Sequence, residues 1–378
     1  MSIFFDHNST TALNPEVLKV MIEIYQKPYN NSAVHQLGRQ AQSIVEHAKN
    51  VIKKALNAEN YEVIFTSGAT ESCNQVIFAN NQNKLFYSTI EHACIDSCKP
   101  QNKTITYFPC DHNGIISLEN LEKILTQNII PNPTISNDFI AFAMLANNET
   151  GAIQPAQKIG KIIHQKSGLF FCDIVQAVGK IKVDLEEINA DFACLSAHKI
   201  HGPQGVGALL VRKNIDLKPL IFGGKHQQGK RAGTLNIAGI AGFAKAVEIA
   251  TNNLEQYSKI SELRDFLEIQ LKKIARDHLK IFCNDQPRLA NTSLIALANC
   301  DSQTQIINFD LSRIYLSAGS TCSSGTISQS RILQAMNCPQ QFIDSAIRIS
   351  LGLTTTKTDI EKFISIWDNF YQQKFLKK

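Results

Sequence analysis

Blocks of apolar and polar positions along the chain predict a large α/β domain. Short apolar runs rich in β-branched and aromatic residues predict strands at 61–66, 85–87, 104–108, 139–145, 169–172, 191–195 and 207–211. Amphipathic stretches between most of these runs predict helices at 117–127, 155–166 and 185–188. Because strands and helices alternate, the pattern favours a mainly parallel sheet with helices packed on it.

The two ends of the chain follow other patterns. Asn14 followed by Pro15 indicates a helix start, and a second helix is expected at 38–56. A helical pattern runs over 236–275 with a break near Asn252 and Asn253, and strands are then expected at 279–282, 292–297 and 346–350. We therefore expect a large domain at 15–250 and a small α+β domain at 251–378, with residues 1–14 packing on the small one.

Composition narrows the classes of function. The chain has 378 residues and a net charge of +5, with no long basic block, so neither a nucleic acid nor a membrane is an expected partner. No stretch approaches the ~18 apolar residues of a membrane helix, and the first residues do not read as a signal peptide, so a cytoplasmic protein is expected. The ten cysteines include no CxxC pair and lie mostly in apolar runs, which indicates reduced core thiols without a resident metal.

Lys199 is the first candidate for chemistry. It ends the cluster Ser196-Ala197-His198-Lys199, which follows an apolar run and precedes a turn rich in Gly and Pro. Desolvation at the mouth of a buried strand favours the free amine, which can attack a carbonyl. Lys199 is thus a Schiff-base candidate, and the alternative is an ordinary exposed loop lysine.

Polar residues also follow two other predicted strands. Asp173 comes directly after an apolar run, and the segment 147–151 follows the run at 139–145. Because the carboxyl ends of parallel strands meet at one edge of a sheet, these groups should open on the same edge as Lys199. A buried Asp173 requires a cationic partner, unless it only caps the next turn.

Three further features leave alternatives open. The strand-to-helix turn at 67–70 is either a phosphate cradle or an ordinary helix start. Arg348, inside an apolar strand pattern, should meet an anion, which is either a structural carboxylate or a ligand. Cys322 lies in a small polar loop at about 318–328, where exposure suits a nucleophilic thiol rather than a core one.

Taken in order, these pieces resemble the cysteine desulfurases of the NifS/IscS class, group I. These are class-V aminotransferases with the fold type I of pyridoxal-phosphate-dependent transferases, as in aspartate aminotransferase. The resemblance covers nearly the whole chain, and its most specific motifs are Thr66 to Ser72, Glu91-His92, Asn147 to Gly151, Asp173 with Gln176, Ser196 to Lys199, Arg231 to Thr234, Ser320 to Ser324, and Arg348 to Gly352.

The resemblance implies pyridoxal 5′-phosphate as the cofactor and gives each site residue a role. Lys199 would bind the cofactor covalently and move a proton, Asp173 would pair with the ring nitrogen, His92 would stack on the ring and take part in catalysis, and Gln176 would hydrogen-bond the ring oxygen. The phosphate would be held by Ala69, Thr70, Ser196 and His198, and by Thr234 of a second subunit, which implies a homodimer. Asn148 and Arg348 would bind the substrate carboxylate.

The implied reaction converts L-cysteine to L-alanine and leaves a persulfide on Cys322. The sulfur would pass to an acceptor protein, either an iron–sulfur scaffold or a sulfur shuttle, and Cys322 could share an iron–sulfur cluster transiently. The alternatives are a selenocysteine lyase or β-lyase, and a non-catalytic protein of the same fold. Two departures from the family pattern stand out. The first motif has His7 and Ser9 where the family commonly has Tyr or Asn and then Ala. The chain also ends at Lys378 without the extended tail that docks a scaffold, which leaves the acceptor open.

Overall fold

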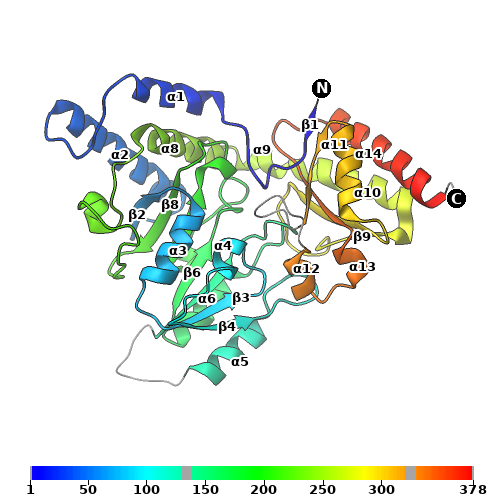
Figure 1. The fold of residues 1–378 in the computed structure, drawn as a ribbon, viewed down its shortest axis with the longest axis horizontal. Helices are drawn as coiled ribbons and strands as arrows, with labels where there is room; N and C mark the ends of the chain where they lie inside the picture. Colours follow the sequence, from blue (N-terminus) through cyan, green and yellow to red (C-terminus); the bar gives the residue numbers. More distant parts are fainter. Residues whose placement is uncertain (1, 130–137, 320–328, 377–378) are drawn as a thin grey trace.

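The computed structural model describes residues 2–129, 138–319 and 329–376 (Figure 1). Its largest sheet has seven strands in the order β2-β8-β7-β6-β5-β3-β4. These strands are β2 Tyr61–Thr66, β3 Lys84–Ser88, β4 Thr104–Phe108, β5 Phe139–Met144, β6 Leu169–Asp173, β7 Phe192–Ser196 and β8 Gly207–Arg212. Only β8 runs antiparallel to its two neighbours, so the predicted α/β class with a mainly parallel sheet is confirmed.

Helices cover both faces of this sheet. Alternate residues of β5 enter opposite cores: Phe139 and Ala141 pack on one side, Ile140 and Phe142 on the other. This burial on both faces explains why the strands appear in the sequence as continuous apolar runs. The first face carries α1 Pro15–Tyr25, α2 Gln36–Ala55, α5 Leu118–Asn128, α6 Ala156–Gln165, α7 Leu185–Ile188 and α8 Ile237–Asn252, and the second carries α3 Ala69–Ala79 and α4 Ala93–Asp96.

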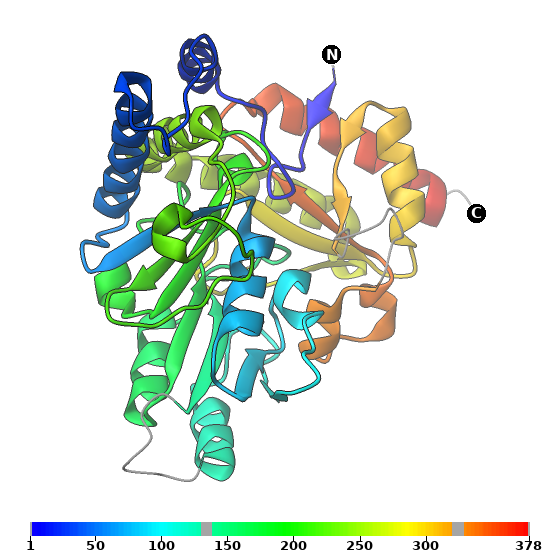
Figure 2. The same cartoon turned by 60° about the vertical axis from the view of Figure 1, so that its left-hand side comes forward.

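A second, smaller unit lies beside the large sheet (Figures 1 and 2). Its antiparallel sheet has the order β12-β13-β10-β9, and its separate core contains the buried Trp367. The elements are α9 Leu254–Ser258, α10 Ile260–Ala275, β9 Leu279–Ile281, β10 Thr292–Leu297, α11 Ser302–Leu311, β11 Ile314–Tyr315, β12 Ser317–Ala318, α12 Arg331–Ala335, α13 Gln340–Ile343, β13 Ala346–Ser350 and α14 Lys357–Tyr371. The predicted division between residues 250 and 251 stays a prediction.

The N-terminal segment joins the two units. Strand β1, Ile3–Phe4, pairs in parallel with β11 of the smaller unit, and Asp6 bridges to Ser350. In both views this first strand lies with the yellow-to-red part of the chain, while α1 lies over the large sheet (Figures 1 and 2). Residues 5–14 therefore cross from one unit to the other.

Several predicted boundaries were wrong by a few residues. The second helix begins at Gln36 rather than 38, because the ring of His35 caps it by accepting the backbone N–H of Gly38. The pattern at 236–275 breaks after Asn252 as predicted, but it breaks again at Lys259. Within the three described segments, no helix is both long and apolar enough to span a membrane.

Candidate active site

A cavity of about 520 Å³ opens at the carboxyl ends of β5, β6 and β7, a size typical of small-molecule sites. It brings together ten of the residues singled out in the sequence: Ala69, Thr70, His92, Asn148, Asp173, Gln176, Ser196, His198, Lys199 and Arg348. Their common location follows from the parallel strands, whose carboxyl ends share an edge. The roles assigned to them from the resemblance stay predictions.

The start of α3 forms one wall of the cavity. Gly68 precedes the helix, and no side chain caps the first turn, so its backbone N–H groups and the helix dipole face a place suited to an anion. Gly207 lets β8 approach closely here, because a Cβ on it would lie 2.6 Å from Cα of Gly68. The side chains of Thr70 and Ser196 line the same wall. This wall fits a phosphate group.

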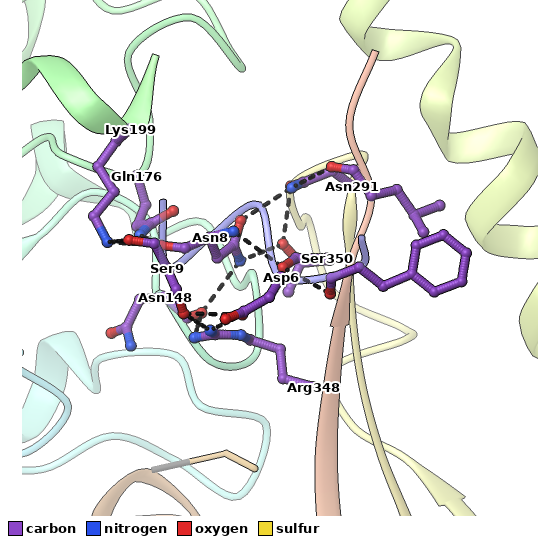
Figure 3. A network of polar contacts seen from close by, with 12 residues as sticks. Asp6, Asn8, Ser9, Asn148, Gln176, Lys199, Asn291, Arg348 and Ser350 are labelled. Atoms are coloured by element: carbon purple, nitrogen blue, oxygen red, sulfur yellow. Dashed lines mark hydrogen bonds and ion pairs between the residues drawn. The ribbon is translucent and has the colours of Figure 1, made fainter. Parts of the chain in front are cut away.

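Lys199 ends the short 3-10 turn Ala197–Lys199 that follows β7. Its Nζ donates hydrogen bonds to the backbone oxygens of Asn8 at 2.8 Å and Ser9 at 2.7 Å (Figure 3). Both acceptors belong to the segment that crosses between the two units. The amine is thus held at the cavity by backbone carbonyls that could release it to a ligand.

Asp173 is the last residue of β6, and its side chain is buried. Burial raises its pKa to about 6, although a hydrogen bond from the backbone N–H of Val175 and the charge of Lys199 act in the opposite direction. Among the described residues Asp173 forms no ion pair. A cation that entered the cavity would stabilise the ionised carboxylate, so the site fits a protonated ring nitrogen.

Two histidines on the cavity wall are neutral at neutral pH. Burial, followed by the charges of Lys199, Arg331 and Arg348, lowers the pKa of His92 to about 4. The Nδ1 of His92 accepts the backbone N–H of Cys94 at 3.2 Å, so the proton of the neutral ring is on Nε2. Burial and Lys199 likewise lower the pKa of His198 to about 4.

Arg348 lies in the middle of β13 with 3% of its surface exposed. Its Nη2 donates to Oδ1 of Asp6 at 2.6 Å and to Oγ of Ser9 at 2.7 Å, and its Nη1 donates to the backbone oxygen of Asn148 at 3.0 Å (Figure 3). The structural ion pair left open by the sequence therefore exists. The buried Nε has no partner among the described groups, and Arg348 lines the cavity, so protein groups do not use every donor of the guanidinium.

One predicted site residue is not brought to the cavity of its own chain, and the structure does not describe another. Thr234 is exposed and does not line it. Cys322 lies outside the described residues. The described residues on either side of 320–328 both lie against Glu149: Ser330 donates to its Oε2, and a Cβ on Gly319 would be 3.1 Å from the same atom. Gly319 and Ser330 therefore lie beside the residue that follows Asn148, which is part of the cavity.

The sequence analysis missed four residues of the site. Asp6, Asn8 and Ser9 come from the N-terminal segment and contact Arg348, Lys199 or both, whereas Lys180 hydrogen-bonds Gln176. A signal existed for Ser9, which departs from the family pattern, whereas Asn8 stands at a position that the pattern leaves open. Lys180 had a weaker one: it is a lysine within an apolar run, four residues after Gln176.

Comparisons with known proteins agree with this geometry. The family model for aminotransferase class-V matches residues 3–363. The cysteine desulfurase IscS of Dictyoglomus turgidum is 34% identical, over 98% of this chain and 95% of its own length. Among solved structures, a NifS-like protein from Rickettsia africae is 35% identical with a TM-score of 0.90, over 98% of this chain and 100% of the other.

A further solved structure, described as SspA in complex with cysteine, is 26% identical with a TM-score of 0.77, over 94% of this chain and 100% of the other. The match of the family model covers almost every element of both units, from β1 into α14. The chain therefore belongs to the aminotransferase class-V family, among its cysteine desulfurases.

Proposed function

We propose that this protein converts L-cysteine to L-alanine in the cavity described above and holds the released sulfur as a persulfide on Cys322. The observation that carries the proposal is that Lys199, Asp173 and the uncapped start of α3 line one cavity. Enzymes of this family depend on pyridoxal 5′-phosphate, which has a carbonyl, a ring nitrogen and a phosphate for these three partners.

The residues present fit that cofactor. Lys199 would hold it covalently, Asp173 would pair with its ring nitrogen, and Gln176 and His92 would contact the ring. The first turn of α3 would bind the phosphate, together with the side chains of Thr70, Ser196 and His198. When bound, the cofactor supplies an electron sink for the pair that remains after the substrate loses its Cα proton.

The side chains of the chain perform the remaining steps. The guanidinium of Arg348 and the side chain of Asn148 bind the substrate carboxylate, while Asp6 and Ser9 hold the guanidinium in place. Lys199 takes the proton from Cα and returns a proton as alanine forms. The rings of His92 and His198 are buried and neutral, so neither adds a positive charge beside the substrate or the phosphate.

Sulfur transfer requires the thiolate of Cys322. It attacks the substrate Sγ, and a new S–S bond forms while the Cβ–Sγ bond breaks. The electron pair of the broken bond returns to carbon, which is then protonated to give alanine. The position of Gly319 and Ser330 beside Glu149 supports this role, because Glu149 directly follows Asn148, which lines the cavity.

The persulfide sulfur would pass to a thiol of an acceptor protein, such as an iron–sulfur scaffold or a sulfur shuttle. A cytoplasmic location remains the expectation from the sequence. We also propose a homodimer, because Thr234, the predicted phosphate ligand, is exposed and does not line the cavity of its own chain. In such a dimer Thr234 would complete the phosphate site of the partner.

The reaction is tested by mixing the protein with pyridoxal phosphate, L-cysteine and a thiol reductant, and by measuring alanine and sulfide. We expect equal amounts of both products. Cys322→Ala should keep the absorbance band of the bound cofactor and lose sulfide release, whereas Lys199→Ala should lose the band. Full sulfide release by Cys322→Ala would refute the assigned nucleophile, and an unchanged band in Lys199→Ala would refute the assigned lysine.

The dimer is tested by complementation. Lys199→Ala and Thr234→Ala variants are each assayed alone and then after mixing under conditions that exchange subunits. A mixed dimer would contain one site with both an intact Lys199 and an intact Thr234, so activity should rise on mixing. Activity equal to the average of the two variants, or a monomer in sedimentation, would contradict the shared site.

A further inference from the structure

Lys180 is a buried lysine for which the reaction has no direct use. Its residue is 5% exposed, and it lies in the turn that follows β6, four residues after Gln176. Its Nζ donates to Oε1 of Gln176 at 2.6 Å and to Oδ1 of Asn8 at 2.7 Å. Both acceptors are neutral amide oxygens, and no ion pair of Lys180 is found in the described part of the chain.

This placement is costly for a lysine. Burial, with Lys199 and Arg348 as nearby positive charges, lowers the pKa of Lys180 well below its ordinary value. A methionine of similar length would fill the same space without the cost of desolvating an amine. The hydrogen bonds of Lys180 are therefore better explained by an effect on their partners than by a gain in stability.

The effect concerns the orientation of an amide. The side chain of Gln176 can present either its oxygen or its NH₂ group to the cavity, because the two ends have nearly the same shape. Lys180 is a hydrogen-bond donor at Oε1, and the other end, Nε2, donates to the backbone oxygen of Asn8 at 2.9 Å. With both contacts made, Oε1 is engaged by the lysine and one N–H of Nε2 remains for a ligand.

The side-chain amide of Asn8 is held in one orientation in the same way. Its Oδ1 accepts from Lys180, so its Nδ2 donates to Oγ1 of Thr292 at 2.9 Å and to the backbone oxygen of Asn148 at 3.2 Å. The backbone oxygen of Asn8 is shared by Nε2 of Gln176 and Nζ of Lys199 (Figure 3). Lys180 thus hydrogen-bonds two amides, those of Gln176 and Asn8, that contact the catalytic part of the cavity.

We propose that Lys180 is a positioning residue that fixes the amide of Gln176 with its NH₂ group towards the cavity, so that this group donates to the ring oxygen of the bound cofactor. The inference rests on the proposed function, because it requires pyridoxal phosphate in the cavity. An unfixed Gln176 would turn its oxygen towards the ring oxygen part of the time, and two acceptors facing each other repel.

A double-mutant cycle tests this role, with Lys180→Met and Gln176→Ala made singly and together. The measurements are the dissociation constant of pyridoxal phosphate for the cofactor-free protein and the absorbance maximum of the bound cofactor, which reports the hydrogen bond at its ring oxygen. Lys182→Met is the matched control, because Lys182 is an exposed lysine two residues along the same segment. Thermal unfolding of each cofactor-free variant establishes that it is folded.

We expect Lys180→Met to weaken cofactor binding about 10-fold and to shift the absorbance maximum, as the loss of a buried hydrogen bond would. In the Gln176→Ala background the same substitution should change binding less than about 2-fold. Lys182→Met should change neither measurement. If Lys180→Met does not fold, Lys180→Gln replaces it in the cycle. The glutamine side chain is shorter but still ends in a hydrogen-bond donor, so this variant should show only part of the loss in cofactor binding.

Equal losses in both backgrounds would overturn the inference, because Lys180 would then act independently of Gln176. An unchanged absorbance maximum in Lys180→Met would overturn it as well. Failure of the proposed function looks different: the wild-type protein and Lys182→Met would then show no cofactor band at all.

Discussion

Three acidic side chains close to the cavity, Glu91, Glu149 and Asp173, are buried, and burial is the main cause that raises the pKa of each. The values are about 8 for Glu91, about 7 for Glu149 and about 6 for Asp173. The raised pKa of Asp173 is consistent with the proposed site, because a cationic ligand would restore the negative charge of its carboxylate. Glu91 has no such ligand in the proposed reaction, and its Oε2 is without a hydrogen-bond partner in the described structure.

Glu91 therefore makes stability depend on pH. Its pKa in the folded chain, about 8, is above the ordinary 4.5, so its contribution is fully present below pH 4.5 and is lost as pH rises through about 8. From this group alone, the free energy of unfolding should fall by up to about 1.4 kcal/mol per pH unit in that window. Glu91→Gln should remove this part of the slope in urea unfolding measured at several pH values.

The control for this measurement is Glu119→Gln, which changes an exposed glutamate at the start of α5. It should keep the pH dependence of the wild type, to which the lowered pKa values of His92 and His198 also contribute with the opposite sign. The interpretation of Glu91 is wrong if Glu91→Gln and Glu119→Gln show the same slope.

At the scale of elements, the sequence was most informative where burial is complete. β5 and β6 are covered on both faces, so their apolar runs stand out, and the helix starts with Asn14-Pro15 and Ser117 carry clear capping signals. The strands β1 and β11 have two residues each, too few to show an alternation of apolar and polar positions. β1 also pairs with a strand more than three hundred residues away. Such an element depends on tertiary contacts that no local pattern contains.

The junction between β8 and α3 gives a second prediction. A Cβ on Gly207 would meet the backbone of Gly68 at 2.6 Å and the backbone oxygen of Leu195 at 2.7 Å, and neither can move without shifting its element. Gly207→Ala should therefore destabilise the protein by about 1–3 kcal/mol and, because the start of α3 moves, weaken cofactor binding. Thermal unfolding and titration with pyridoxal phosphate measure the two effects.

Gly229→Ala serves as the comparison. Gly229 has a φ of 78° and nothing within 4 Å of its added Cβ, so the cost is the left-handed backbone alone, about 1 kcal/mol. Binding of pyridoxal phosphate should be unchanged in this variant. Normal binding in Gly207→Ala would show that the close approach of β8 does not position the phosphate wall.

At the scale of the whole molecule, Asn8 joins the two units. Its side chain contacts Asn291 of the smaller unit and the backbone of Asn148 at the large sheet (Figure 3). It also contacts Thr292 of the smaller unit and Lys180 of the larger one. The residue is 1% exposed, so these partners have no water to replace it. The network links the cavity to the packing of one unit against the other.

Asn8→Ala should accordingly be costly. The substitution leaves buried donors on Lys180 and Asn291 without their acceptor, so we expect a loss of about 2–4 kcal/mol in the free energy of unfolding. Urea unfolding of the cofactor-free protein measures it. Asn284→Ala, at an exposed position, should stay within about 0.5 kcal/mol of the wild type, and an equal result for both variants would contradict the role of the network.

The site could be predicted in part for the same reason as the fold. Asp173, Asn148 and Lys199 follow apolar runs, and parallel pairing brings such strand ends together wherever the strands lie in the sequence. The partner of Arg348 could not be predicted, because Asp6 is 342 residues away and any acidic residue was an equal candidate. Lys180 could not be recognised as buried among polar groups, because one of its two acceptors, Asn8, is 172 residues away in the sequence.

The contacts of the N-terminal segment also set an order of assembly during synthesis. Asp6 is made 342 residues before Arg348, an interval on the order of tens of seconds on the ribosome. The seven strands of the large sheet all lie within residues 61–212, so they can pair while the smaller unit is still being translated. Residues 3–6 must wait without these partners until β11 and β13 emerge, and the binding site for the substrate carboxylate is therefore among the last features of the protein to form.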